Sequence, residues 1–314
     1  MALSIVIVNY KSSDVLEKCL ESVYASKISL PLEVIVVDND SKDQGLSALK
    51  DKYTQINFIR SLENKGFAGG CNLGIRAAHG EWILLLNPDT EVNENAIQCL
   101  YNKLVEDWQV GIVGPKIYNS GGSLQMKAHP KKMPVLYDFF CEMFYLDKLF
   151  PHSKRMNSYY GADFNYDKEQ YVEQVCGACL MVKREVAERI GLLDEKLFLY
   201  FDETDWCRRA TKAGCRILYV PSATVLHHQG RSSNIDRKKS TELYYESQLY
   251  LFRKHYGVLA AALLYFLNLV GFVFRIFVIP IYLLKDRNAD KIMRHFWALL
   301  YHLNPTHFLK AMSL

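Results

Sequence analysis

The sequence has few of the features that would place it in several common protein classes. Its 314 residues carry a formal net charge of only +4, whereas a nucleic-acid-binding domain concentrates basic residues on one face. Nucleic acid is therefore not an expected partner. The first apolar run, residues 5–8, is short and is followed at once by polar Asn9, which is not the pattern of a secretory signal peptide. No internal repeat is present.

The cysteines do not form a recognisable metal-binding pattern. The eight cysteines are scattered, and only Cys176 and Cys179 form a CxxC pair. The second pair that a zinc site of this type requires is missing, and the existing pair lies in an apolar, strand-like stretch. We therefore expect buried, reduced thiols, which is typical of the cytoplasm. Apolar residues make up 50% of the chain, enough for one large domain or two moderate ones.

The first half of the chain alternates short apolar strands with amphipathic helices. This pattern predicts a mostly parallel sheet with helices on both faces, an α/β fold. The predicted strands are residues 3–8, 34–37, 57–60 and 82–86. Polar residues follow several of these strands, at the edge of an open α/β sheet where ligands bind.

The second half is less regular. From about residue 111 to 171 the apolar pattern loosens, and Gly121-Gly122 predicts a hairpin turn. After it we expect strands at 174–182, 216–220 and 223–226, and helices at 184–190 and 202–213. Gly214 is a plausible C-terminal cap for the second helix.

The C-terminal part has a different composition. Residues 258–284 contain one charge, Arg275, and are long enough to span a bilayer. Basic residues Lys285, Arg287, Lys291 and Arg294 follow, which favours the cytoplasmic side. A single crossing would separate this flank from the cytoplasmic domain before it. We therefore favour a re-entrant or interfacial helical hairpin, bent near Pro280. A buried helical pair packed on the domain or on a second subunit is the alternative.

Asp89 is the first candidate site residue. It follows the strand at 82–86 in the sequence Asn87-Pro88-Asp89. Mg²⁺ and Mn²⁺ prefer oxygen ligands, usually one or two carboxylates together with substrate phosphates. A cation held here would neutralise the charge on a departing diphosphate. The alternative is an Asn-Pro-Asp turn without a ligand.

Other polar segments point to a phosphorylated ligand. Residues 64–72 are glycine-rich and precede a short helix, a combination suited to phosphate, although the Gly-Lys-Ser/Thr ending of a P-loop is missing. A tight strand-to-helix turn explains the glycines nearly as well. Asp38 ends a strand and is able to bind a base N–H or to cap a turn. His227 follows a late strand. It is a candidate metal ligand or diphosphate contact, and the alternative is a structural histidine.

The last acidic group is Asp202-Glu203-Thr204-Asp205, which opens a predicted helix. Asp202 is a plausible N-cap, and Asp205 three residues later resembles a capping box and favours the helix dipole. Glu203 is left without a structural role.

Taken together, these segments resemble glycosyltransferase family 2, and within it the bacterial dTDP-rhamnosyltransferase-like members. The resemblance runs in order through roughly residues 3–235. It is carried by residues 4–10 (SIVIVNY), 36–41 (VVDNDS), 64–72 (NKGFAGGCN), 87–89 (NPD), 177–181 (GACLM), 191–195 (GLLDE), 201–209 (FDETDWCRR) and the pair His227-His228.

The resemblance implies a GT-A fold in residues 1–235. A nucleotide-sugar-binding half, about 1–115, would join an acceptor-binding half, about 116–235, through one continuous sheet. Residues 236–314 would form a helical, membrane-associating region. The metal motif reads Asn-Pro-Asp instead of Asp-x-Asp. With one carboxylate fewer, a divalent cation (Mg²⁺ or Mn²⁺) at Asp89 and His227 would depend more on the donor diphosphate.

The implied reaction is a single displacement with inversion. We expect L-rhamnose to move from dTDP-L-rhamnose to a lipid-linked saccharide in surface polysaccharide synthesis. The place would be the cytoplasmic face of the bacterial inner membrane, reached by a peripheral or re-entrant segment at 258–284. The alternatives are a UDP-hexose, UDP-galactofuranose or GDP-mannose donor, and an inactive nucleotide-binding scaffold. The sequence does not decide between a monomer and a homodimer.

The site residues follow from this assignment. Glu203 is the expected base, with Asp202 in reserve, because Asp38 and Asp89 serve the donor and neighbouring carboxylates should raise the pKa of Glu203. The expected donor-binding residues are Asn9, Asp38, Asn64, Lys65, Gly66, Gly69, Asn72, Asn87, Asp89 and Arg231.

Overall fold

A computed structural model describes residues 2–42, 45–128, 132–159, 161–162, 164–228, 236–285 and 289–313. The chain divides into two compact units. The sheet unit comprises Met1–Met133, Phe164–Phe198 and Asp202–Asn234, and the helical unit comprises Pro134–Asp163, Leu199–Phe201 and Ile235–Leu314. The helical unit thus takes in residues 134–163, which the sequence pattern did not assign to it.

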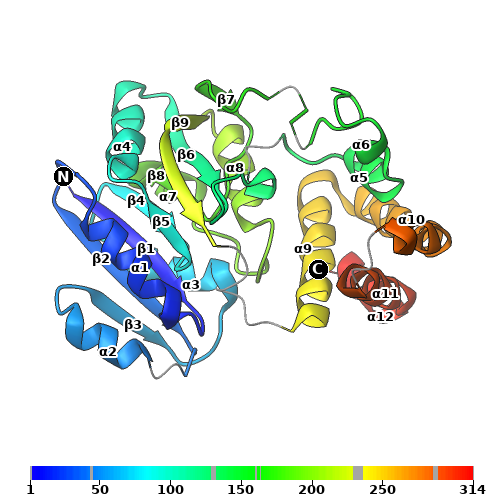
Figure 1. The fold of residues 1–314 in the computed structure, drawn as a ribbon, viewed down its shortest axis with the longest axis horizontal. Coiled ribbons are helices and arrows are strands. Elements are labelled where there is room, and N and C mark those ends of the chain that lie inside the picture. Colours follow the sequence, from blue (N-terminus) through cyan, green and yellow to red (C-terminus); the bar gives the residue numbers. More distant parts are fainter. Residues whose placement is uncertain are drawn as a thin grey trace. The chain divides into compact units, whose positions relative to one another are not determined.

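The sheet unit is built on one continuous nine-stranded sheet (Figure 1). Its strand order is β3-β2-β1-β4-β8-β6-β9-β5, and β7 pairs with β9. Strands β3, β2, β1 and β4 are parallel, and β8 is antiparallel to β4. The strands are β1 (Leu3–Asn9), β2 (Leu32–Asn39), β3 (Asn57–Ser61), β4 (Trp82–Leu86), β5 (Thr90–Val92), β6 (Val110–Tyr118), β7 (Gln170–Val172), β8 (Cys179–Lys183) and β9 (Arg216–His227). The predicted α/β fold is confirmed.

Helices cover both faces of this sheet, which is why its central strands are apolar at nearly every position. Ile5 and Ile7 of β1 pack in one core cluster, and Val6 and Val8 pack in the other, on the opposite face. The first cluster includes α1 (Ser13–Tyr24), α2 (Gly45–Lys52) and α4 (Ala96–Glu106). The second includes α3 (Gly66–Ala77), α7 (Arg184–Ile190) and α8 (Asp202–Lys212).

The sequence pattern was wrong about several strands. The strand expected at 174–182 begins only at Cys179, and the short strands β5 and β7 were not expected. Strand β6 lies in the stretch where the apolar pattern loosened, because Gly111, Gly114 and Pro115 interrupt it. The glycine at 114 is needed there, since a Cβ would lie 2.5 Å from the Val175 side chain. Strand β9 is one strand instead of the two expected, and the break at Pro221 is a shift in its register with β6.

The helical unit contains α5 (Leu136–Met143), α6 (Leu146–Leu149), α9 (Arg237–Tyr256), α10 (Val258–Lys285), α11 (Ala289–Leu303) and α12 (Pro305–Ser313). Helix α10 runs without a break through Pro280, so the bend expected there does not interrupt it. It packs against α5, α9, α11 and α12. By length and composition, Val258–Val278 is the one candidate membrane span in the part of the chain that is described.

Candidate active site

The candidate site lies at the edge of the sheet where the parallel strands end. Asn9 ends β1, Asp38 lies near the end of β2, and Asn87 follows β4. Because these strands are adjacent and parallel, their carboxyl ends meet at one edge, the usual place for a ligand in an open α/β sheet. The structure therefore brings these three predicted residues to one side of the sheet.

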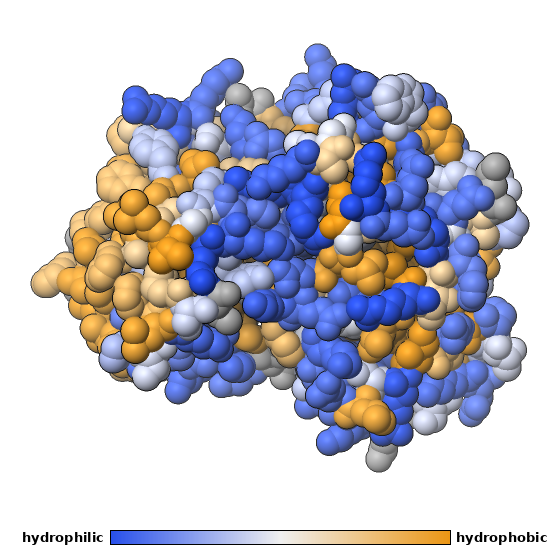
Figure 2. Space-filling model, turned by 180° about the vertical axis from the view of Figure 1, so that it is seen from behind, coloured by the Kyte–Doolittle hydropathy of each residue, from blue (hydrophilic) through white to orange (hydrophobic). Residues whose placement is uncertain are grey.

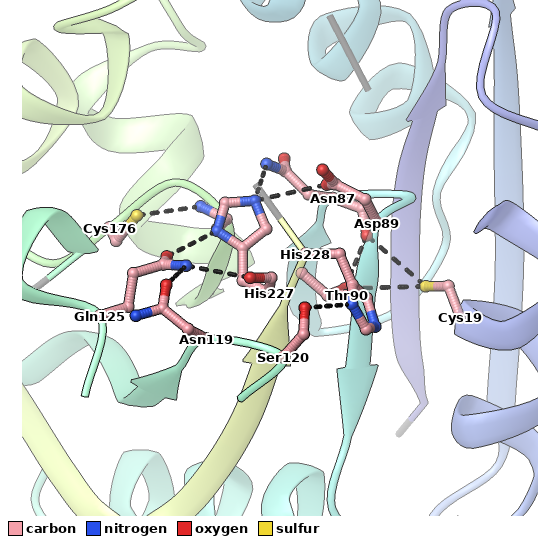
Figure 3. A network of polar contacts seen from close by, with 11 residues as sticks. Cys19, Asn87, Asp89, Thr90, Asn119, Ser120, Gln125, Cys176, His227 and His228 are labelled. Atoms are coloured by element: carbon pink, nitrogen blue, oxygen red, sulfur yellow. Dashed lines mark hydrogen bonds and ion pairs between the residues drawn. The ribbon is translucent and has the colours of Figure 1, made fainter. Parts of the chain in front are cut away.

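Asp89 and His227 form a close pair at this edge (Figure 3). The Oδ1 atom of Asp89 lies 3.3 Å from Nε2 of His227, and the Asp89 side chain is fully buried. The pairing of β5 with β9 explains the contact, since Thr90 stands opposite His227 in the antiparallel register. The Asn87 amide nitrogen lies 3.4 Å from the same Nε2 atom. Asp89 and His227, which are more than 130 positions apart in the sequence, thus meet in the fold.

Gln125, which sequence reasoning missed, orients His227. Its Oε1 lies 2.8 Å from Nδ1 of His227, and its Nε2 donates to the His227 carbonyl and to Oδ1 of Asn119, each at 3.0 Å. Because both other contacts of the amide are with carbonyl oxygens, Oε1 must be the atom that faces the ring. Nδ1 then carries a proton, and Nε2 is the ring nitrogen that faces Asp89. No spacing or motif in the sequence signals this role.

The Asp89–His227 pair fits a divalent cation with few protein ligands. The pair offers a carboxylate oxygen and an imidazole nitrogen with a fixed tautomer, the arrangement that a hydrogen bond behind a metal-binding histidine produces. Within the described residues, no group of three or more His, Cys, Asp or Glu is placed to hold a metal. A cation here would take its remaining ligands from phosphate and water.

His228, the neighbour of His227, has different partners. Its Nε2 lies 2.6 Å from Oε1 of Glu91, and its Nδ1 lies 2.7 Å from the Ser120 hydroxyl. Its backbone N–H donates to the Asp89 carbonyl at 2.9 Å, which continues the β5–β9 pairing. Of the two adjacent histidines, only His227 contacts the Asp89 side chain within the described structure.

The glycine-rich residues 64–72 were expected to form a loop before a helix. In the structure most of them belong to the helix itself. Helix α3 begins at Gly66 and includes Gly69, Gly70 and Gly74. A Cβ at Gly70 would lie 2.6 Å from the Val8 side chain, and one at Gly74 would lie 2.3 Å from Val6. These two glycines therefore allow α3 to pack closely on β1. Gly66, at φ 70° and with its Cβ position 2.1 Å from the Phe198 carbonyl, also requires glycine.

Asn39 holds the segment that leads into this helix, and no sequence signal distinguishes it from its neighbours. Its amide donates to Oδ1 of Asn64 at 3.0 Å and to the Gly66 carbonyl at 2.9 Å, while its own Oδ1 accepts from the Lys65 backbone at 3.0 Å. Asn64 also accepts from the Gly66 N–H at 2.9 Å. The Lys65 ammonium is paired with Glu63 at 2.8 Å.

Asp38 and Asn9 brace the loop after β2. Oδ1 of Asp38 accepts from both the backbone N–H and the hydroxyl of Ser41, at 3.0 and 2.5 Å. Asn9 is fully buried, accepts from the Ser12 hydroxyl at 2.9 Å and donates to Ser41 at 3.5 Å. The turn-capping role considered for Asp38 is thus present, and it uses one carboxylate oxygen.

Asn72 is engaged elsewhere in the protein. Its side chain donates to the Leu193 carbonyl and to Oε1 of Glu195, each at 2.9 Å, and accepts from the Leu193 N–H at 3.0 Å. It is buried, so the amide ties α3 to residues 193–195 instead of facing a ligand. Arg231, another predicted donor contact, lies outside the described residues.

The acidic group at the start of α8 separates into three environments. Asp202 is buried, and this burial together with the neighbouring Glu203 raises the pKa of Asp202 well above its usual range. Glu203 is partly exposed. Asp205 is fully buried, and its Oδ2 accepts from Nε of Arg209 at 2.8 Å. Asp202 is the first residue of α8, and the preceding Phe201 has a φ of 63°.

A short segment before β8 connects the two groups of site residues. The Ala178 carbonyl accepts from the Asn87 N–H at 2.9 Å, beside the Asp89 turn. A Cβ on Gly177 would lie 3.4 Å from the Cβ of Glu203. Residues 177–178 therefore contact both the strand-end turn and the acidic helix start. The neighbouring thiol of Cys179 is buried, which raises its pKa, as expected for a structural cysteine.

The mixed nine-stranded sheet with helices on both faces has the GT-A fold of solved glycosyltransferase structures, and comparison with known sequences adds the family. The family model described as glycosyl transferase family 2 matches residues 4–191. The chain belongs to this family, and it is a glycosyltransferase. The family assignment made from the sequence is confirmed.

Two curated relatives match most of the chain. It is 32% identical over 233 residues to the low-salt glycan biosynthesis hexosyltransferase Agl10 of Haloferax volcanii, covering 72% of this chain and 67% of the relative. It is 27% identical over 267 residues to the N-acetylglucosaminyl-diphospho-decaprenol L-rhamnosyltransferase of Mycobacterium tuberculosis, covering 81% and 85%. Among solved structures, the mannosyltransferase PcManGT from Pyrobaculum calidifontis in complex with GDP-Man and Mn²⁺ is similar with a TM-score of 0.56 at 16% identity, over 99% of this chain and 85% of that chain.

Proposed function

We propose that this glycosyltransferase moves L-rhamnose from dTDP-L-rhamnose, with inversion, to a hydroxyl of a lipid-linked saccharide at the cytoplasmic face of the bacterial inner membrane. The observation that carries the chemistry is the Asp89–His227 pair, connected through residues 177–178 to Glu203. The rhamnosyl donor and lipid-linked acceptor are supported by the name of the Mycobacterium tuberculosis relative. The apolar helix α10 supports a membrane location.

On the donor side, Asp89 and His227 would hold Mg²⁺ or Mn²⁺ together with the donor diphosphate. When bound, the cation supplies positive charge that stabilises the departing diphosphate. Gln125 fixes the ring of His227 with Nε2 toward Asp89, so the site is preorganised for this role. Asp38, whose Oδ1 is held by Ser41, is proposed to face the base of the nucleotide.

On the acceptor side, Glu203 is proposed to remove the proton from the attacking hydroxyl. The structure favours it over its neighbours. Asp205 is bound to Arg209. Asp202 is buried, and its pKa is raised well above its usual range, which favours the neutral form that is not a base. Glu203 is the member of the group that is partly exposed and able to meet an acceptor.

Charge-neutralising substitutions test the base. We expect Glu203→Gln to lose about 10²-fold or more in turnover while donor affinity stays nearly unchanged. Asp202→Asn is the matched control and should keep most of the turnover, and Asp205→Asn should act mainly through stability. Near-native turnover of Glu203→Gln, combined with loss in Asp202→Asn, would assign the base to Asp202.

The donor needs a separate experiment. We expect dTDP to bind at least about tenfold more tightly than GDP in calorimetry, and transfer from dTDP-rhamnose to a panel of lipid-linked acceptors to give a product whose linkage NMR determines. Equal or reversed nucleotide preference would reject a thymidine donor. It would favour UDP-hexose, UDP-galactofuranose or GDP-mannose. Nucleotide binding without transfer from any of these donors would favour the inactive scaffold.

A further inference from the structure

Helix α10 belongs to the helical unit and has two faces of different chemistry. On its inner face Asn268 donates to Oε1 of Gln248 on α9 at 2.8 Å, and the Tyr265 hydroxyl donates to the His302 carbonyl on α11 at 2.6 Å. Both α10 residues are buried. An apolar helix that crossed a bilayer alone would have no partners for such groups. Here the neighbouring helices of the same unit supply them.

Arg275, the one charged residue in the apolar stretch 258–284, lies on the same inner face. It is buried, and its guanidinium donates to the carbonyls of Glu142 and Met143, the last residues of α5. The guanidinium also lies over the Tyr145 ring, 4.7 Å from its centroid. A cation at a helix C-terminus is favourable because the carbonyl ends carry partial negative charge. The charge is therefore satisfied inside the protein and does not face solvent or lipid.

The outer face of α10 is a continuous apolar stripe. It consists of Leu259, Leu263, Phe266, Val270, Phe274 and Phe277. Successive members are three or four residues apart, which places them on one side of a helix, and their exposed fractions range from 37% to 75%. At 1.5 Å per residue the stripe is about 27 Å long. We call these six residues the α10 stripe.

The apolar surface extends beyond this one helix. Exposed Phe296 and Leu300 of α11 and Leu309 of α12 add to it. Figure 2 shows apolar side chains gathered over the C-terminal helices, on the left of that view. Exposed apolar surface of this extent is unusual on a soluble monomer and marks a partner or a membrane.

We infer that the α10 stripe and its neighbours on α11 and α12 insert into one leaflet of a lipid bilayer, so that α10 lies along the membrane and does not cross it. The inference deepens the proposed function, on which it rests only in placing the enzyme beside a membrane-bound acceptor. The proposed partner of this apolar surface is an anionic phospholipid membrane.

Charge supports a lipid partner. Residues 235–314 carry eleven Lys and Arg against five Asp and Glu, a net charge of +6, whereas the remaining residues carry 27 against 29, a net charge of −2. The basic excess of the chain is thus concentrated in the segment that bears the apolar stripe, and it remains so when the buried Arg275 is left out of the sum. An apolar face combined with basic residues is the composition of segments that bind the surface of anionic membranes.

The neighbour of α10 argues against a crossing. Helix α9 (Arg237–Tyr256) packs along α10 and carries Glu242 and Glu246 in its interior. If α10 crossed the bilayer with its packing intact, α9 would carry these carboxylates into the hydrocarbon, where a charged side chain costs several kcal/mol. Insertion of the outer face alone leaves α9 in water.

Vesicle flotation tests the inference without relying on transfer activity. We expect the full-length protein to float with vesicles of phosphatidylglycerol and phosphatidylcholine, and less with phosphatidylcholine alone. The double variant Phe266→Asp/Phe277→Asp should bind about tenfold or more weakly. The matched control is Leu62→Asp, at a residue 90% exposed on the sheet unit, which should bind as the wild type does. Equal binding of the double variant and the wild type would overturn the inference.

Depth and oligomeric state separate the remaining outcomes. The fluorescence that Phe266→Trp adds to that of the four native tryptophans should be quenched more by bromine atoms near the headgroups than by bromine at the bilayer centre. Stronger quenching at the centre would show a crossing helix. A soluble dimer of the wild type that the double variant converts to monomer would show instead that a second copy covers the stripe. Vesicle binding without transfer from dTDP-rhamnose would reject the proposed donor and leave this inference standing.

Discussion

Gln125→Leu tests whether the orientation of His227 matters. The substitution keeps a side chain of similar size but removes the Oε1 atom that lies 2.8 Å from Nδ1 of His227. It also removes the amide that donates to the His227 carbonyl and to Asn119, each at 3.0 Å. Because Gln125 is only 2% exposed, water cannot readily replace these bonds.

The size of the effect follows from the contacts. Three buried hydrogen bonds at about 1 kcal/mol each predict a loss of about 3 kcal/mol of stability. The imidazole would also be free to rotate or change tautomer, and loss of such a partner behind a metal ligand typically weakens metal binding by about 10- to 100-fold. The loss should fall on metal affinity more than on turnover at saturating metal.

The assay is Mn²⁺ binding in the presence of dTDP, with free Mn²⁺ counted by electron paramagnetic resonance. Ser120→Ala is the matched control, because it removes the hydroxyl that lies 2.7 Å from Nδ1 of His228, the adjacent histidine with no contact to the Asp89 side chain in the described structure. We expect the control to bind Mn²⁺ as the wild type does. Unchanged Mn²⁺ affinity in a folded Gln125→Leu variant, or an equal loss in Ser120→Ala, would refute the role given to Gln125.

Three further outcomes are expected. Asp89→Ala should abolish transfer and its dependence on divalent ions while the circular dichroism spectrum is kept, and full wild-type activity in EDTA would rule out the metal. The raised pKa of Asp202 means that the native state favours its neutral form, so wild-type stability falls as pH rises above the unfolded value of 3.8. Asp202→Asn should therefore raise the melting temperature more at pH 8 than at pH 4. Burial lowers the pKa of His302 from 6.5 to about 4, so the native state keeps it neutral, and roughly 3 kcal/mol of stability should be lost as pH falls through this range. Thermal melts of His302→Gln should show a weaker acid dependence.

The sequence predicted the fold well where local signals were strong. Apolar runs such as residues 3–8 and 34–37 identified the central strands, because strands covered on both faces are apolar throughout. Arg184–Ile190 formed the helix that its spacing predicted. The pattern failed at β6, where Gly111 and Gly114 serve tertiary contacts that do not depend on strand propensity.

The residues of the candidate site were also predicted where the sequence signal was local and missed where it was not. Asp89 and His227 were selected because each follows a strand, a local signal that the order of segments in family 2 strengthened. The sequence also suggested that residues 64–72 approach a ligand. In the structure Gly70 and Gly74 instead let α3 pack on β1, and Asn72 binds residues 193–195. A glycine needed for helix packing and a glycine needed for a ligand look the same in a sequence.

By itself, then, the sequence determined the α/β class, the family and the polar residues that follow the strands, because these depend on local periodicity and on motifs in order along the chain. Only the tertiary structure decided that Gln125 orients His227, 102 positions further along the chain, that burial raises the pKa of Asp202, and that Arg275 faces the end of α5. These features depend on which distant segments meet and on how much water their contacts exclude. Neither is encoded in the spacing of neighbouring residues.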